Sequence, residues 1–394
     1  MKKIILALTA VCTLSLAARM ADKPLLKVFD AAYRQEPYKN VLLSPWGIQE
    51  CFGMIYGGAG KVSAAELTRT LGIDAALGSE LRQARELLKQ SFPKFNSFNA
   101  ILFDRKYTLQ KNFTNYAGKQ YNGKLFSVDF ARKKEAVDML NGIIKRESSG
   151  MFDKVFNEKI LSSDPAMVLL NVLYFQGRWA LPFEKHLTKK EKFYAPSKSK
   201  FEKIHHSLVD MMNDERFIPY YNDGTVHGIA LRYRGTGSSD VNMLVLTGVK
   251  SDTPLHVVTK SLADKGVMHF VNHSSSEHKT IVKLPELKLE GEVDLKKLFT
   301  ALGMKTMFDP RTGDLTGMTE KRTLYIDRAK QLLKLKLDEN GSEMSAVTYA
   351  MPKALALPPR IVKKNRFYAD HPFVLVLFDR QSGALLLTAA VVKP

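Results

Sequence analysis

Side chains that could do chemistry are scattered through this sequence of 394 residues without the spacing of a known catalytic motif. There is no GxSxG, no Walker A loop and no HExxH. His205 and His206 are adjacent, so in a strand they point to opposite faces and make a poor metal pair. His273 and His278 flank a polar run typical of a solvated loop, and residues 235–239 fit a loop joining two strands better than a dinucleotide site. We therefore expect no metal, no cofactor and no enzyme, although a Ser–His hydrolase stays open because a triad is defined by geometry.

The segment 338–360, DENGSEMSAVTYAMPKALALPPR, has a composition that fits no ordinary structural role. Between positions 341 and 358 its only charged side chains are Glu343 and Lys353. Small, β-branched and hydroxyl-bearing residues dominate it, so it is too polar for a core helix and too apolar for a solvated linker. We therefore expect this segment to have a function that depends on the surrounding fold.

Basic residues exceed acidic ones, with 59 Lys and Arg against 40 Asp and Glu and a formal net charge of +19. Such an excess favours contact with polyanions, acidic membranes or acidic proteins, and it says nothing about the fold. The densest basic runs are residues 132–134, 185–203 and 362–366. Because these runs are dispersed and poor in interleaved aromatic residues, solvated surface explains them better than a polyanion site, which remains the alternative.

The N-terminus has the layout of a secretory signal peptide over residues 1–17. Two lysines precede a largely apolar run over residues 4–18, and Ser-Leu-Ala at 15–17 fits the small-x-small cleavage pattern. Arg19 ends this run before the roughly 20 apolar residues that a membrane span needs. Cleavage would leave Cys51 as the single cysteine, so no internal disulfide can form. We expect a secreted protein, extracellular or periplasmic, without a transmembrane segment.

Helix signals come early in the chain. Ser44 before Pro45 predicts an N-cap with proline at the first helical position. Ser63 and Glu66 have the spacing of a capping box and predict a helix that begins at Ser63. Residues 135–149 have helical periodicity.

Strand signals come mostly later. Residues 166–175, AMVLLNVLYF, are almost continuously apolar and predict a strand buried on both faces. The other predicted strands lie within 98–105, 243–248 and 280–291 and in a hairpin over 373–394 that turns at 380–383. Early helices, later strands and no regular βαβ alternation predict an α+β fold.

Together these segments resemble the serpin family over almost the whole mature chain. The blocks that carry the likeness are NVLLSPWGI (40–48), NVLYFQGRW (171–179), VDMM (209–212), LPELKLEG (284–291), DLTG (314–317), DENGSE (338–343) and FYADHPFVLVLFD (367–379). The resemblance implies a single domain over residues 22–394 with three β-sheets and eight or nine helices. It also implies an exposed reactive-centre loop at about 339–360.

Inhibitory serpins are suicide substrates of serine or cysteine proteases. The protease cleaves the loop, which then inserts into the large sheet while the acyl-enzyme persists. Family spacing places the reactive bond between Leu355 and Ala356, which would suit a chymotrypsin-like or elastase-like serine endopeptidase, or a cysteine protease. A shifted register would place it between Lys353 and Ala354 and attract trypsin-like enzymes. The resemblance therefore implies a monomeric protease inhibitor.

The resemblance further implies two groups of residues that control insertion. The loop hinge comprises Glu339, Gly341, Ser342, Glu343, Met344, Ser345 and Ala346. The sheet-opening region comprises Asn171, Trp179 and Thr188. An inserted strand has one face against the core, so residues of one parity must tolerate burial. Both charges of the loop fall at odd positions, which leaves the even face uncharged.

The chain departs from the family pattern at several positions. Met344 is bulky where inhibitory members usually carry a small residue. Pro352 removes one ladder hydrogen bond, although it falls late, towards the end of the new strand. Gln331 and Leu332 replace a His-Lys pair, which we expect near the point where insertion starts, and Gln176 replaces a lysine. These departures leave open an alternative function as a non-inhibitory binding or carrier protein.

Overall fold

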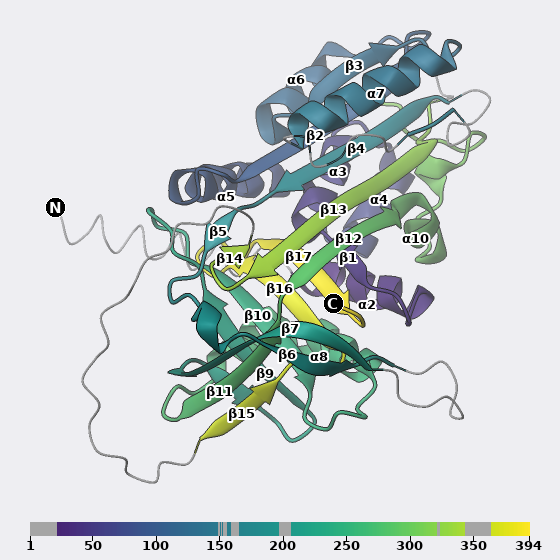
Figure 1. The fold of residues 1–394 in the computed structure, drawn as a ribbon. Helices are drawn as coiled ribbons and strands as arrows, with labels where there is room; N and C mark the ends of the chain where they lie inside the picture. The colour runs from purple at the N-terminus through teal and green to yellow at the C-terminus, as the bar shows by residue number, and fades with distance from the viewer. Residues whose placement is uncertain are drawn as a thin grey trace, which may run out of the picture.

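The computed structural model describes residues 22–148, 150, 152, 156–158, 165–196, 206–320, 324–342 and 364–394. In this part of the chain, nine α-helices and three β-sheets confirm the predicted α+β fold (Figure 1). The helices are α2 (Asp22–Gln35), α3 (Pro45–Tyr56), α4 (Lys61–Leu71), α5 (Leu77–Ser91), α6 (Lys111–Tyr121), α7 (Lys133–Glu147), α8 (Leu255–Lys265), α9 (Val267–Asn272) and α10 (Leu295–Ala301). Two short 3₁₀ helices are η1 (Lys185–Leu187) and η2 (Thr306–Phe308).

The three sheets differ in size. The six-stranded sheet has the order β1 (Val41–Leu43), β17 (Leu385–Val391), β16 (Phe373–Asp379), β10 (Val241–Gly248), β9 (Val226–Arg232) and β8 (Tyr220–Asn222). The four-stranded sheet has the order β15 (Asn365–Tyr368), β11 (Lys279–Pro285), β7 (His206–Phe217) and β6 (Lys189–Tyr194). The seven-stranded sheet, hereafter the large sheet, has the order β3 (Lys124–Val128), β2 (Asn96–Asp104), β4 (Met167–Tyr174), β13 (Arg328–Asp338), β14 (Gly341–Ser342) and β5 (Gly177–Arg178). Its seventh strand, β12 (Leu287–Asp294), pairs with β13.

The large sheet is covered on both faces, as Figure 1 shows for α7 on one side and α3 on the other. Val168, Leu170 and Val172 of β4 pack in a cluster with apolar residues of α7, whereas Leu169 and Leu173 face the main core. The prediction of a strand buried on both faces is therefore confirmed.

One predicted helix cap is correct and the other is wrong. Ser44 caps α3, since its Oγ accepts the Gly47 N–H at 3.0 Å. Helix α4 begins at Lys61, and Ser63 is not its N-cap. The carboxylate of Asp314 accepts the N–H of Ser63 at 3.5 Å from outside the helix.

Glu66, the other half of the predicted capping box, also has a different role. Its Oε2 accepts the N–H groups of Lys305 and Thr306, each at 3.1 Å. The carboxylate of Asp314, which is distant in sequence, thus accepts a hydrogen bond at the start of α4. Glu66 instead binds the backbone where η2 begins.

The strand predictions are confirmed with one refinement. Residues 280–291 form two strands in different sheets, because β11 ends at Pro285 and β12 begins at Leu287. The predicted hairpin is the β16–β17 pair. Asp379 organises its turn by accepting the Ser382 N–H at 3.0 Å. The loop at 235–239 does join two strands, β9 and β10.

A buried ion pair lies beneath the large sheet. Glu50 of α3 accepts hydrogen bonds from Arg85 of α5 at 2.5 and 2.9 Å and from Asn99 of β2 at 2.7 Å. Ser97 also donates to this carboxylate. The side chains of Glu50 and Arg85 are 0% and 4% exposed, so neither charge can be satisfied by water if its partner is lost.

Replacing Glu50 by glutamine should therefore destabilise the fold. The substitution keeps the side-chain volume but leaves the Arg85 guanidinium buried without a counter-charge. We expect the free energy of unfolding, measured in urea, to fall by about 3–5 kcal/mol. Glu86→Gln, an exposed glutamate of the same helix as Arg85, is the control and should change it by less than about 0.5 kcal/mol. Equal effects of the two variants would contradict this account.

Candidate functional site

The large sheet is incomplete between β4 and β13. These strands pair in parallel only from Arg328 to Leu332 of β13. On the same edge, pairing resumes at Leu337, which pairs with Ser342 of β14. Among the described residues, no strand pairs with residues 333–336 on this edge, whereas β12 covers the opposite edge. An unpaired strand edge is a template for an additional strand.

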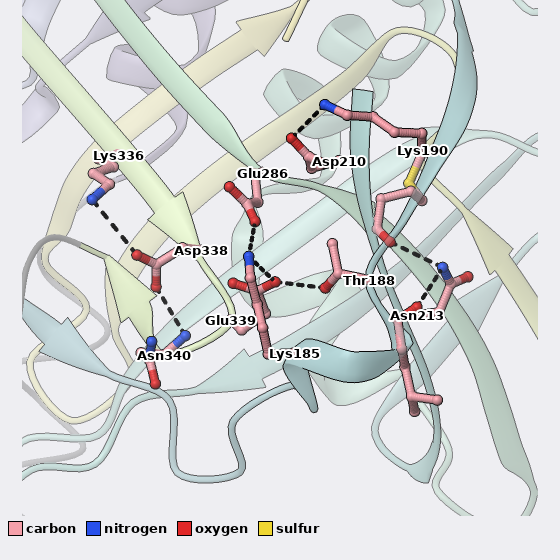
Figure 2. Close-up of polar contacts among 12 residues, drawn as sticks. Lys185, Thr188, Lys190, Asp210, Asn213, Glu286, Lys336, Asp338, Glu339 and Asn340 are labelled. Atoms are coloured by element: carbon pink, nitrogen blue, oxygen red, sulfur yellow. Dashed lines mark hydrogen bonds and ion pairs between the residues drawn. The ribbon is translucent and has the colours of Figure 1, made fainter. Parts of the chain in front are cut away.

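Glu339 anchors the turn that closes this gap at one end (Figure 2). Lys185 Nζ lies 2.8 Å from Glu339 Oε1 and 2.7 Å from Glu286 Oε1. Thr188 Oγ1 donates to Glu339 Oε1 at 2.5 Å. The Phe183 N–H donates to the Glu339 carbonyl at 2.9 Å. The hinge glutamate is thereby fixed to the segment that leads into β6.

The electrostatics keep Glu339 and Lys185 charged. Burial of Glu339 acts to raise the pKa of its carboxyl, but hydrogen bonds from Lys185 and Thr188 outweigh burial, and the pKa is lowered from its ordinary value. Hydrogen bonds to Glu286 and Glu339 raise the pKa of Lys185. The contact is therefore an ion pair at neutral pH. Because Lys185 is 72% exposed, water and salt weaken this pair.

Trp179 holds the backbone of the same turn. Its N–H donates to the Asn340 carbonyl at 2.8 Å, and its indole N–H donates to the Asp338 carbonyl at 3.0 Å. Its ring lies on Tyr233, with centroids 4.3 Å apart. The Tyr233 hydroxyl in turn hydrogen-bonds to Ser342 Oγ. Trp179, which the family resemblance placed in the sheet-opening region, thus contacts the turn that carries Glu339 and Asn340.

Gly341 is required by geometry. Its φ of +144° is disfavoured for residues with a side chain, and a Cβ here would lie 2.1 Å from the Gly177 carbonyl oxygen. The close approach of the two backbones lets β14 pair with β5. A side chain at this position would separate the two strands.

Asn171 does not lie with Trp179 and Thr188. It is in the paired part of the sheet, where its Nδ2 donates to Asn99 Oδ1 at 2.7 Å. Gln331 Nε2 donates to Asn171 Oδ1 at 3.3 Å. The predicted sheet-opening region is therefore two separate sites, one at the hinge and one in the middle of the sheet.

Gln331 lies in β13, the strand that leads up to the loop, as predicted. It is in the part of β13 that pairs with β4, seven residues before Asp338 ends the strand, and is 1% exposed. Its Oε1 accepts the Ser44 N–H at 2.7 Å, and its Nε2 donates to the Ser44 carbonyl at 3.0 Å. These two hydrogen bonds connect β13 to the start of α3. The length of β13 separates Gln331 from Glu339.

Several predicted residues fall outside the described part of the chain. They are the hinge residues Glu343, Met344, Ser345 and Ala346, the reactive-bond residues Leu355 and Ala356, the alternative pair Lys353 and Ala354, and Pro352. Within the described part, sequence reasoning missed Lys185, Glu286 and Tyr233. Glu286 lies inside a block of family likeness, which is a signal that could have identified it. Nothing in the sequence singles out Tyr233.

The basic runs do not gather into one patch where the structure describes them. Lys190 pairs with Asp210, and Lys364 pairs with Glu215. The strands β6 and β15, which carry two of the runs, are opposite edges of one sheet, and the run at 132–134 lies at the start of α7.

The remaining candidates for a chemical role are metal ligands and the free cysteine. No cluster of His, Cys, Asp and Glu that could hold a metal occurs in the described part of the chain. Burial raises the pKa of the Cys51 thiol to about 12, so this cysteine is inert at neutral pH. A search of the described helices for one long and apolar enough to cross a bilayer finds none.

Comparisons with known proteins agree with one another. A family model described as Serpin (serine protease inhibitor) matches residues 24–394. Iripin-2 from Ixodes ricinus is 30% identical over 370 residues, covering 91% of this chain and 88% of the relative. Glia-derived nexin from Rattus norvegicus is 25% identical over 378 residues, covering 94% and 91%.

Solved structures show the same fold. Native protease nexin-1 with heparin matches with a TM-score of 0.81 at 20% identity, covering 97% of this chain and 100% of that one. Serpin48 from the insect Tenebrio molitor matches with a TM-score of 0.78 at 22% identity, covering 96% and 98%. At these identities the likeness shows the fold alone.

Glu339→Gln should loosen the hinge in a pH-dependent way. The pKa of Glu339 is lowered in the folded chain, so its stabilising effect is present above about pH 4.3, the ordinary glutamate value, and is lost as pH falls through the lowered pKa. At pH 7 we expect the variant to be less stable by about 0.5–1 kcal/mol, since Lys185 is exposed. The difference from wild type should vanish in acid. Glu277→Gln, an exposed control, should show no difference at either pH.

Proposed function

The chain belongs to the serpin family, and from that premise we propose that it is a secreted suicide-substrate inhibitor of serine or cysteine endopeptidases, not a catalyst. The observation that carries the proposal is the unpaired edge of β13 at residues 333–336. This edge begins where the hairpin leading into the loop ends, so the loop can extend β14 into the sheet without a new turn. The gain of a fully paired strand would drive the reaction.

The pairing of β14 on β13 supports a specific register for the inserted loop. Leu337 pairs with Ser342 in antiparallel fashion. The pairs obtained by extending this register are Glu343 with Lys336, Met344 with Leu335, Ser345 with Lys334, Ala346 with Leu333 and Thr348 with Gln331.

This register explains the distribution of charge along the loop. Leu333, Leu335 and Leu337 are buried in the main core, so even-numbered loop residues, which carry no charge, would face that core. Glu343 would face the other side beside Lys336, where opposite charges on neighbouring strands attract.

The departures at positions 344 and 331 can be weighed in the same register. Met344 would contact Leu335 in the core, where a flexible thioether side chain fills irregular space better than a branched one. Thr348 would lie opposite Gln331 and offer it a hydroxyl. We therefore favour inhibition over the alternative of a non-inhibitory carrier.

The protease class is inferred from the expected reactive bond. Leu355 before Ala356 supports a serine endopeptidase of chymotrypsin-like or elastase-like specificity, or a cysteine protease that reads apolar side chains. The signal-like residues 1–17 support secretion to an extracellular or periplasmic space. One structural match contains heparin, and the net charge is +19, but the basic runs are dispersed, so we leave a polyanion out of the proposal.

A panel of chymotrypsin-like, elastase-like, trypsin-like and papain-like proteases tests the mechanism. We expect an SDS-stable covalent complex with at least one enzyme of apolar specificity. The released C-terminal peptide should begin at Ala356 by mass spectrometry, whereas a peptide that begins at Ala354 would assign the bond to Lys353. Cleavage by every enzyme without a complex, and without a rise in melting temperature of the cleaved chain, would leave the carrier function.

A matched pair of loop variants tests the register. Ala346→Glu would place a carboxylate against Leu333 in the core, so we expect cleavage without complex formation and a stoichiometry of inhibition raised at least severalfold. Ser345→Glu adds the same charge one position earlier, opposite Lys334, and should still form the complex. The register is wrong if the two variants inhibit equally well.

A further inference from the structure

A pocket of about 560 Å³ lies at the hinge end of the large sheet, outside the contacts that hold Glu339. Its walls come from four segments that are far apart in the sequence: the end of α5 and the residues after it, β5 with the residue before it, the segment after β9, and the end of β13 with the hinge. This volume is within the range of small-molecule sites in proteins.

The pocket walls are fixed to one another by hydrogen bonds. The Thr236 N–H donates to the Ser91 carbonyl at 3.0 Å, and the Ser239 N–H donates to Ser91 Oγ at 3.0 Å. The Arg234 N–H donates to the Arg178 carbonyl at 2.7 Å. A ligand would therefore enter a cavity that already exists and would not have to order these segments.

Uncompensated positive charge surrounds the pocket. Lys94, Arg178, Arg234 and Lys336 line it, against the single carboxylate of Asp338. The Nζ of Lys336 lies 3.8 Å from Oδ2 of Asp338. In the described part of the chain, Lys94, Arg178 and Arg234 have no carboxylate within ion-pair distance, whereas Lys185, Lys190 and Lys364 each have one. An anion is the ligand that this arrangement favours.

The pocket also has an apolar side. Phe92 is 3% exposed and packs on Phe175 with ring centroids 5.3 Å apart, and Pro93 lies next to it. We propose that the pocket binds a small amphiphilic organic anion, with its apolar body on Phe92 and Pro93 and its carboxylate, sulfate or phosphate group between Arg178 and Arg234. The planar guanidinium groups match such oxyanions through paired hydrogen bonds.

The ligand discriminates between two conformations of the protein, a step that rests on the proposed function. Gln176, just beyond β4, and Lys336 of β13 both line the pocket, so it spans the two strands that must separate when the loop inserts. Insertion places the carboxylate of Glu343 opposite Lys336 and so competes for the same positive charge. The anion therefore binds the uninserted form, stabilises it and slows inhibition.

Titration calorimetry of the intact native chain with naphthalene-2-carboxylate tests the site. We expect saturable binding by the carboxylate, binding by the neutral naphthalene-2-carboxamide weaker by at least about tenfold, and a similar loss for Arg178→Gln/Arg234→Gln. Arg82→Gln, which removes one exposed charge from α5 outside the pocket, is the control and should bind as wild type does. Arg234→Gln alone, at an exposed position, replaces the double variant if that variant fails to fold.

Equal binding of carboxylate and carboxamide, or unchanged binding to the arginine variants, would overturn the anion site. Binding of the carboxylate to the loop-cleaved, inserted form as tightly as to the native form would overturn the competition. A cleaved chain that gains no thermal stability would instead refute loop insertion, while the titration of the native chain would still decide the pocket. The two proposals therefore fail through different measurements.

Discussion

Some backbone N–H and C=O groups of residues 333–336 point to the edge of β13 that faces away from β12. These groups have no strand partner within the described part of the large sheet. Such groups cost free energy unless water or another strand satisfies them, so this edge can gain stability by accepting a strand. The hinge contacts of Glu339, Gly341 and Trp179 maintain this arrangement, because they hold β14 as a short hairpin at the end of β13. The large sheet therefore keeps one unpaired stretch of strand edge, at residues 333–336 of β13.

The two sites along β13 differ in how readily they open. At the hinge, the ion pair of Glu339 depends on Lys185, which is 72% exposed and so remains accessible to water. In the middle of the sheet, Gln331 and Asn171 are 1% and 2% exposed, and their hydrogen bonds cannot be replaced by water without moving β4 or α3. Separation of the strands should therefore begin at the hinge, where the contacts are weakest, and meet a second, stronger barrier at Gln331 and Asn171.

Local signals in the sequence were sufficient where the interaction is local. Ser44 caps its own helix, but the predicted Ser63–Glu66 box failed because Asp314, distant in sequence, supplies the carboxylate. Ordered blocks of family likeness drew attention to Trp179 and Thr188, and both contact the turn at Asp338 and Glu339. They could not place Lys185 opposite Glu286, because an exposed ion pair leaves no pattern in a single chain.

The positions of the two charges in the loop also show what a single sequence can and cannot predict. The sequence indicated that one face of residues 342–354 is uncharged, but it could not say which face would be buried. The register that we propose from the pairing of Leu337 with Ser342 would place even positions over the core. The same register puts Pro352 opposite Asp327, one residue before β13 begins at Arg328. In this proposed register Pro352, which the sequence places late in the new strand, would fall beyond the end of β13, where β13 requires no hydrogen bond from it.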